Sequence, residues 1–141
     1  MISTASPDLS RYLVTLPDFL LYFLCAVTLL MVFLIVYTRL TPQHEWRLIR
    51  EGNAAAAISL GAALIGFCLP LASAISYSQS LLDMLIWGGV ALVIQWGAFL
   101  AARMLFPGLP KRIEADDKAA GTIVAAISLG TGILNAACLT Y

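Results

Sequence analysis

Four runs of apolar residues, each long enough to cross a lipid bilayer, constrain this chain more than any other feature. They cover residues 19–38, 53–77, 81–106 and 119–141. A helix rises 1.5 Å per residue, so about 20 residues cross the hydrocarbon core of about 30 Å. The runs do not alternate between apolar and polar residues, as the strands of a membrane barrel would. We therefore expect four transmembrane helices.

The composition excludes most soluble classes of protein. The chain is 61% hydrophobic and 11% charged, whereas a soluble domain carries about 25% charged residues. Eight Lys and Arg residues balance eight Asp and Glu residues, so a strongly basic surface for nucleic acid is not expected. The lipid bilayer is the expected environment of this chain, and nucleic acid is not an expected partner.

The basic residues predict the orientation of the four spans. Seven of the eight lie in or beside the loops that follow the first and third spans: Arg39, Arg47, Arg50, Arg103, Lys111, Arg112 and Lys118. Basic loops stay in the cytoplasm. We therefore predict a multi-pass protein of the bacterial inner (plasma) membrane with both loops in the cytoplasm and both termini outside it. The first run lacks a basic leader segment, so we expect a retained span.

Comparing the chain with itself predicts an internal repeat. At an offset of 65 residues the matching pairs include Asp18 with Asp83, Pro42 with Pro107, Arg47 with Arg112, and Glu51 with Asp116. A competing offset of 69 aligns residues 58–61 with 127–130, but 65 also matches the ends of the spans. We predict an all-α membrane protein with an outward-facing tail (residues 1–18) and two parallel tandem repeats of a two-helix hairpin (residues 19–77 and 78–141).

The two basic loops are the predicted docking surface for a partner. Their candidate residues are His44, Glu45, Trp46, Arg47, Arg50, Lys111 and Arg112. A short interfacial helix over residues 42–50 is expected, with Thr41 as its N-cap and Trp46 at the level of the lipid headgroups. Asn53 is expected to cap the second span. The alternative is that these charges only set the orientation of the spans.

Polar residues inside the spans have two interpretations. Gln95 lies near the middle of the third span, on a face of small residues, and the fourth and second spans have similar faces. Small faces allow close helix packing, which predicts a four-helix bundle or a homo-oligomer. In the other interpretation the polar residues line a path for solutes; these candidates are Gln95, Asn135, Ser59 and Ser128.

Two carboxylates occupy equivalent places in the predicted repeat. Asp18 and Asp83 each stand at the outer start of a span, where a negative charge favours a helix N-terminus; a cation site is the alternative. The single histidine and the three cysteines inside the spans form no metal-binding or catalytic pattern. We therefore expect no metal, no cofactor and no enzymatic activity.

Four segments resemble the YjfL family of bacterial inner-membrane proteins: residues 41–56, 69–74, 87–95 and 134–141. Members of that family often end in Asn-Ala-Ala-Cys-Met-Thr, and Leu139 replaces the usual Met here. The repeat unit of the family is known as a domain of unknown function (number 350), generally in tandem. The resemblance implies a four-span protein without an established activity. Some relatives are associated with polyamine-synthesis or ATP-grasp ligase-like enzymes, which implies a cytoplasmic enzyme as partner.

The sequence therefore predicts an accessory or scaffold subunit that docks a partner through its charged loops. A small oligomeric channel or transporter, with a polar path near Gln95 and Asn135, is the alternative. A closed, dry bundle would favour the scaffold, and a polar cavity would favour transport.

Overall fold

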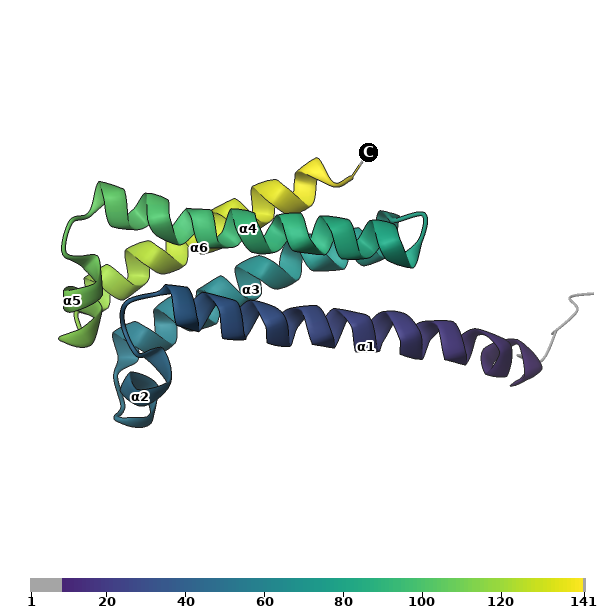
Figure 1. Cartoon of the computed structure of the whole chain (residues 1–141), viewed down its shortest axis with the longest axis horizontal. Coiled ribbons are helices and arrows are strands. Elements are labelled where there is room, and N and C mark those ends of the chain that lie inside the picture. The colour runs from purple at the N-terminus through teal and green to yellow at the C-terminus, as the bar shows by residue number, and fades with distance from the viewer. Residues whose placement is uncertain (1–8, 141) are drawn as a thin grey trace, which may run out of the picture.

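A computed structural model describes residues 9–140, and this part of the chain is entirely helical apart from short connections (Figure 1). Its elements are α1 (Leu9–Leu40), α2 (Glu45–Arg50), α3 (Ala54–Tyr77), α4 (Leu81–Leu105), α5 (Leu109–Glu114) and α6 (Lys118–Cys138). The long helices α1, α3, α4 and α6 are each long and apolar enough to cross a membrane. The predicted all-α fold with four candidate spans is confirmed.

Helix α1 is longer than the first predicted span. It begins at Leu9 and continues through Pro17, so residues 9–18 are helical although they were expected to form a tail; residues 1–8 lie outside the described part. The 20 residues between Asp18 and Arg39 correspond to about 30 Å of helix, one hydrocarbon thickness. The first turns of α1 extend beyond the ends of the other helices (Figure 1).

Helices α3 and α6 form the closest helix pair of the bundle. Both begin at the end where α2 and α5 lie, so they run parallel (Figure 1). A Cβ atom added to Gly121 would lie 2.7 Å from the carbonyl oxygen of Ala55, and one added to Gly132 would overlap the backbone of Gly66. The two backbones therefore touch, as the small-residue faces predict.

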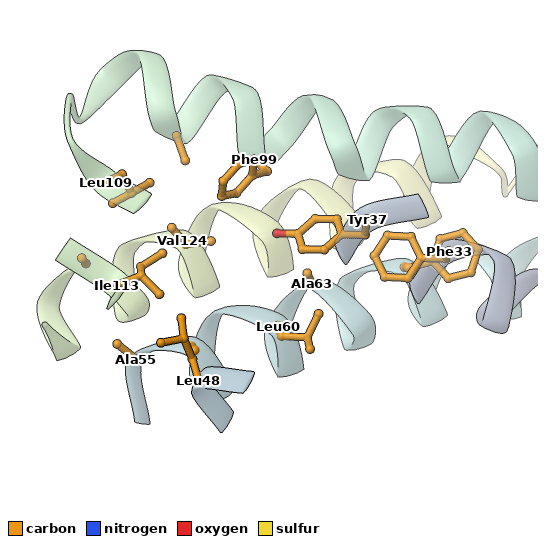
Figure 2. Packing of buried hydrophobic residues seen from close by; sticks show 14 of the residues in the cluster. Phe33, Tyr37, Leu48, Ala55, Leu60, Ala63, Phe99, Leu109, Ile113 and Val124 are labelled. Atoms are coloured by element: carbon orange, nitrogen blue, oxygen red, sulfur yellow. The ribbon is translucent and has the colours of Figure 1, made fainter. Parts of the chain in front are cut away.

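Aromatic side chains join α1 to α3 and α4. Phe33 stacks on Phe67 of α3 with ring centroids 4.5 Å apart, and Tyr37 meets Phe99 of α4 edge-on at 5.9 Å. Figure 2 shows the rings of Phe33 and Tyr37 between the long helices. Such pairs stabilise a core beyond the area that they bury. These contacts all lie in the second half of α1, whereas residues 9–21 are exposed to the surroundings of the bundle.

Capping residues set the ends of the short connections. Asn53 accepts a hydrogen bond from the backbone amide of Ala56 at 2.8 Å, as predicted, and Asp117 caps α6 in the same way. Asp117 lies 64 residues after Asn53, one residue fewer than the offset that the sequence favours. The predicted N-cap role of Thr41 is wrong: α2 begins three residues later than expected, after His44, because the hydroxyl of Thr41 binds elsewhere.

Candidate functional site

The amide of Gln95 is bound inside the bundle. Its Nε2 donates a hydrogen bond to the backbone carbonyl of Ser128, 3.0 Å away, and both residues are buried. A Cβ atom on Gly66 would come within 2.5 Å of both Nε2 of Gln95 and the Ser128 carbonyl oxygen. Three helices therefore meet closely at this depth, and the amide joins α4 to α6 across the glycine of α3.

The structure brings together only part of the predicted polar set. Ser59 is fully buried on α3, and its hydroxyl, like that of Ser128, has no hydrogen-bond partner among residues 9–140. Asn135 is partly exposed and lies seven residues beyond Ser128, about 10 Å along α6. Gln95 and Ser128 thus form a packing contact, and Asn135 stands apart from it.

Replacing Gln95 with leucine should lower the stability of the bundle modestly, by about 0.6 kcal/mol, because one interhelical hydrogen bond is lost while the volume is nearly kept. Unfolding in mixed micelles measures the change. Asn135→Leu is the matched control, since it removes a partly exposed amide from a neighbouring helix and should change stability less. Equal losses in the two variants would contradict a structural role that is specific to Gln95.

The two predicted carboxylates have different settings. Asp83 accepts a hydrogen bond from the backbone amide of Gln79 at 3.1 Å, while its own amide donates to the hydroxyl of Ser80 at 3.2 Å. Ser80 is the N-cap of α4, and Asp83 in the first turn reaches the amide of the residue before this cap, an arrangement close to a capping box. The helix-start interpretation fits Asp83. For Asp18 it is wrong, because α1 begins at Leu9 and Asp18 lies within the helix, beside an apolar hollow of about 440 Å³.

The connections around α2 and α5 are hydrogen-bonded to each other. Nδ2 of Asn53 donates to the carbonyl oxygens of Ile113 at 2.8 Å and Glu114 at 3.3 Å, and the Asp116 carboxylate accepts from the amide of Ala55 at 2.9 Å. Figure 2 shows buried side chains from both short helices, Leu48 of α2 and Leu109 and Ile113 of α5. The exposed side chains of residues 44–53 and 107–117 therefore lie on one joined structure and are called the loop surface.

Most predicted docking residues are exposed on the loop surface: His44, Arg47, Arg50, Lys111 and Arg112. Half of the Trp46 side chain is exposed as well. Two of the cations are paired, Arg47 with Glu51 at 3.9 Å and Arg112 with Asp117 at 2.7 Å. The hydrogen bond from Arg112 lowers the pKa of Asp117 below its ordinary value. Arg50 and Lys111 form no ion pair within residues 9–140, while the exposed Glu114 and Asp116 balance their charge on this surface.

Glu45 is not on the loop surface, contrary to the prediction. Its side chain is fully buried and hydrogen-bonded to the hydroxyl of Thr41. That hydroxyl also lies 3.1 Å from the carbonyl oxygen of Tyr37, and its single hydrogen cannot serve both acceptors. A neutral Glu45 resolves the conflict, because its own proton can be donated to Thr41 while Thr41 donates to Tyr37.

Burial raises the pKa of Glu45 to about 7, and the hydrogen bonds from Thr41 and from the Glu45 backbone amide only partly offset this increase. The second carboxyl oxygen of Glu45 and the hydroxyl of Tyr37 are buried, without hydrogen-bond partners among residues 9–140. This cluster can therefore take up and release a proton near neutral pH.

Comparisons with known proteins agree with this architecture. The family model described as "Domain of Unknown Function (DUF350)" matches residues 11–139. This chain belongs to the DUF350 family. It is 39% identical to the UPF0719 inner membrane protein YjfL of Escherichia coli K12, over 85% of this chain and 91% of that protein. It is 32% identical to the UPF0719 transmembrane protein YshE of Bacillus subtilis, over 82% and 88%. No solved structure matches.

The names of these relatives and the four apolar helices identify this DUF350 chain as an inner-membrane protein of unknown function. The family match also runs across both predicted hairpins. It covers the loop surface and the cluster around Glu45 as well as the spans.

Sequence reasoning missed the polar cluster of this DUF350 protein, although a signal was present. Tyr37, Thr41 and Glu45 follow one another at intervals of four residues, the spacing of one helix face. Pro42 indicates the end of the helix, so the periodicity is not extended across it. The turn after Leu40 nevertheless keeps the three side chains together, because the Thr41 amide still bonds to the Tyr37 carbonyl at 3.0 Å.

Proposed function

We propose that this protein is an accessory or scaffold subunit of the inner membrane whose loop surface docks a cytoplasmic protein, with an enzyme as the candidate partner. The observation that carries the proposal is the set of hydrogen bonds from Asn53 and Asp116. They hold α2 and α5 as one preorganised surface, which lowers the entropy lost when a partner binds. Exposed arginine and lysine side chains suit an acidic patch on that partner.

The proposal places the loop surface in the cytoplasm and both termini outside it, on the basis of the positive-inside distribution of basic residues. It also includes the tandem repeat. The element order long helix, six-residue helix, long helix occurs twice, and left-handed residues, Gly52 and Asp116, precede the two capping residues. Two such hairpins of the same orientation put both basic connections on one side of the membrane.

Site-specific photo-crosslinking in intact cells tests the docking. A crosslinking amino acid at position 50 and, separately, at position 111 should capture the same soluble protein. The matched control position is Met104 on α4, which is apolar and highly exposed. A crosslinking amino acid at this position should capture no soluble protein. The double variant K111E/R112E should reduce capture at position 50 about tenfold, because the acidic patch is then repelled.

Capture of unrelated proteins at positions 50 and 111, or a yield that is unchanged by charge reversal, would contradict the docking proposal. A helical circular dichroism spectrum and an unchanged gel-filtration profile of the double variant serve as the folding control, since Lys111 and Arg112 are exposed.

A channel or transporter with a path near Gln95 and Asn135 has less support. The Gln95 side-chain amide donates a hydrogen bond to the Ser128 carbonyl, and the backbone of Gly66 packs closely against both. A path through one chain would require these contacts to open, so transport would need a route between copies of the chain.

A further inference from the structure

Two hollows on the outside of α1 and α2 join into one groove. The first has a volume of about 550 Å³ and is lined by Thr38 of α1 and by residues 44–47, 50 and 51. The second, of about 360 Å³, is lined by Met31, Leu34, Ile35, Thr38, Arg39 and Trp46. Thr38 and Trp46 line both hollows, so the two adjoin, and together they are called the groove, with an apolar end at Met31 and a charged end beside α2.

The groove is long enough to reach from headgroups into hydrocarbon. Met31 and Arg39 are eight residues apart on α1, which corresponds to about 12 Å along the helix. With α1 spanning the bilayer and Arg39 at the depth of the phosphates, the apolar end lies at the depth of the acyl chains. Trp46, which borders both hollows, is the residue type that favours this interface.

The charged end carries a positive excess. Arg39, Arg47 and Arg50 stand around it, and His44 lines it as well. Two acidic residues also line the groove. The Glu51 carboxylate pairs with Arg47 at 3.9 Å. The Glu45 side chain is buried, and its carboxyl is hydrogen-bonded to the hydroxyl of Thr41. The groove therefore suits a group with one negative charge beside an apolar chain.

We propose that this groove binds one anionic phospholipid of the membrane. The phosphate lies against Arg47 and Arg50, the glycerol region lies beside Trp46, and an acyl chain follows the face of α1 formed by Met31, Leu34 and Ile35. This role goes beyond the docking of a cytoplasmic protein. Arg47 and Arg50 also belong to the loop surface, and the experiment below contains no partner protein, so it tests lipid binding separately.

The corresponding hollow beside α5 lacks the features on which the proposed lipid binding depends. The hollow there, of about 370 Å³, is lined by Pro42, Arg103, Gly108, Pro110, Lys111 and Glu114 and has no aromatic residue. Arg112 is already held by Asp117 at 2.7 Å. The second loop therefore supplies a control with the same loss of charge and no matching groove.

Quenching of Trp46 fluorescence by brominated lipids tests the proposal. Phenylalanine replaces Trp87 and Trp96, so that Trp46 is the only tryptophan in the full chain. The protein is placed in phosphatidylcholine vesicles with equal mole fractions of either brominated phosphatidylglycerol or brominated phosphatidylcholine. The anionic lipid should quench more strongly. The relative affinity derived from the quenching should favour it about thirtyfold, as two arginines near the surface predict.

R47Q/R50Q should reduce this preference to about one, whereas K111Q/R112Q should leave it unchanged. Inorganic phosphate in excess should not relieve the quenching, because the acyl chain contributes to binding. Equal quenching by the two lipids, equal effects of the two double variants, or relief by phosphate would each overturn the proposal. The replaced arginine and lysine side chains are exposed. Gel filtration of each variant verifies that the fold is kept.

Discussion

Gly132→Ala should lower the free energy of unfolding by about 2–3 kcal/mol, near the upper end of the range for overpacking a core. The added Cβ atom would overlap the carbonyl of Gly66 and lie 2.6 Å from its Cα atom. These are backbone atoms that cannot rotate away, so α3 and α6 must separate along their closest contact. The separation would also disturb the Gln95 bond to Ser128. Unfolding in mixed micelles, followed by circular dichroism, measures the loss.

Gly130→Ala is the matched control for this substitution. Gly130 lies two residues earlier on α6, and a Cβ atom there would have nothing within 4 Å. Its replacement should be neutral or stabilising, because alanine favours a helix over glycine by up to about 1 kcal/mol. If both alanine variants were equally stable, the close approach of α3 and α6 would be wrong.

The stability of the protein should fall as the pH rises from about 5 to 8, because of Glu45. The ordinary pKa of this carboxyl is 4.5, and in the folded chain it is about 7. Between these values the folded state holds more protons than the unfolded state, so the free energy of unfolding decreases with pH and levels off above pH 7. Each unit of pKa shift corresponds to about 1.4 kcal/mol. The midpoint of thermal unfolding, measured at several pH values, reports the slope.

Glu45→Gln should remove most of this slope, since the amide stays neutral at every pH. Glu51→Gln is the control. Glu51 is exposed, and within residues 9–140 its side chain forms only the 3.9 Å pair with Arg47, so the slope should persist. Asp117 does not interfere, because its pKa is lowered and it titrates below this range. A midpoint that rises with pH would show that Glu45 is charged in the folded protein, and a slope that survives Glu45→Gln would show that another group causes it.

Much of the fold could be predicted because each feature depends on neighbours in sequence. The apolar runs set the long helices, and Asn53 before an apolar run predicts the cap that the structure has. The small-residue face of α4, which includes Gly88, Ala91 and Ala98, is buried as expected. The beginning of α1 was misplaced, because Arg11, Pro17 and Asp18 interrupt the apolar pattern while the helix continues through them.

The candidate site was predicted only in part. The basic residues of the two connections are exposed, as expected of a docking surface, because charged side chains that bind no buried partner stay at the surface. Glu45 stands in the same stretch and is buried. Its buried position depends on contacts with Tyr37 and Thr41 across the turn at Pro42. No local sequence pattern distinguishes the buried Glu45 from the exposed Arg47.

The sequence by itself determined that this is a four-span membrane protein with basic connections, since bilayer thickness and helix rise act on each segment alone. Only the tertiary structure decided that Gln95 binds the Ser128 carbonyl, that the connections join through Asn53, and that Glu45 is buried. The physical reason is distance along the chain. Residues 33 or 60 positions apart meet only after the helices pack, and packing depends on side-chain shape that no single segment encodes.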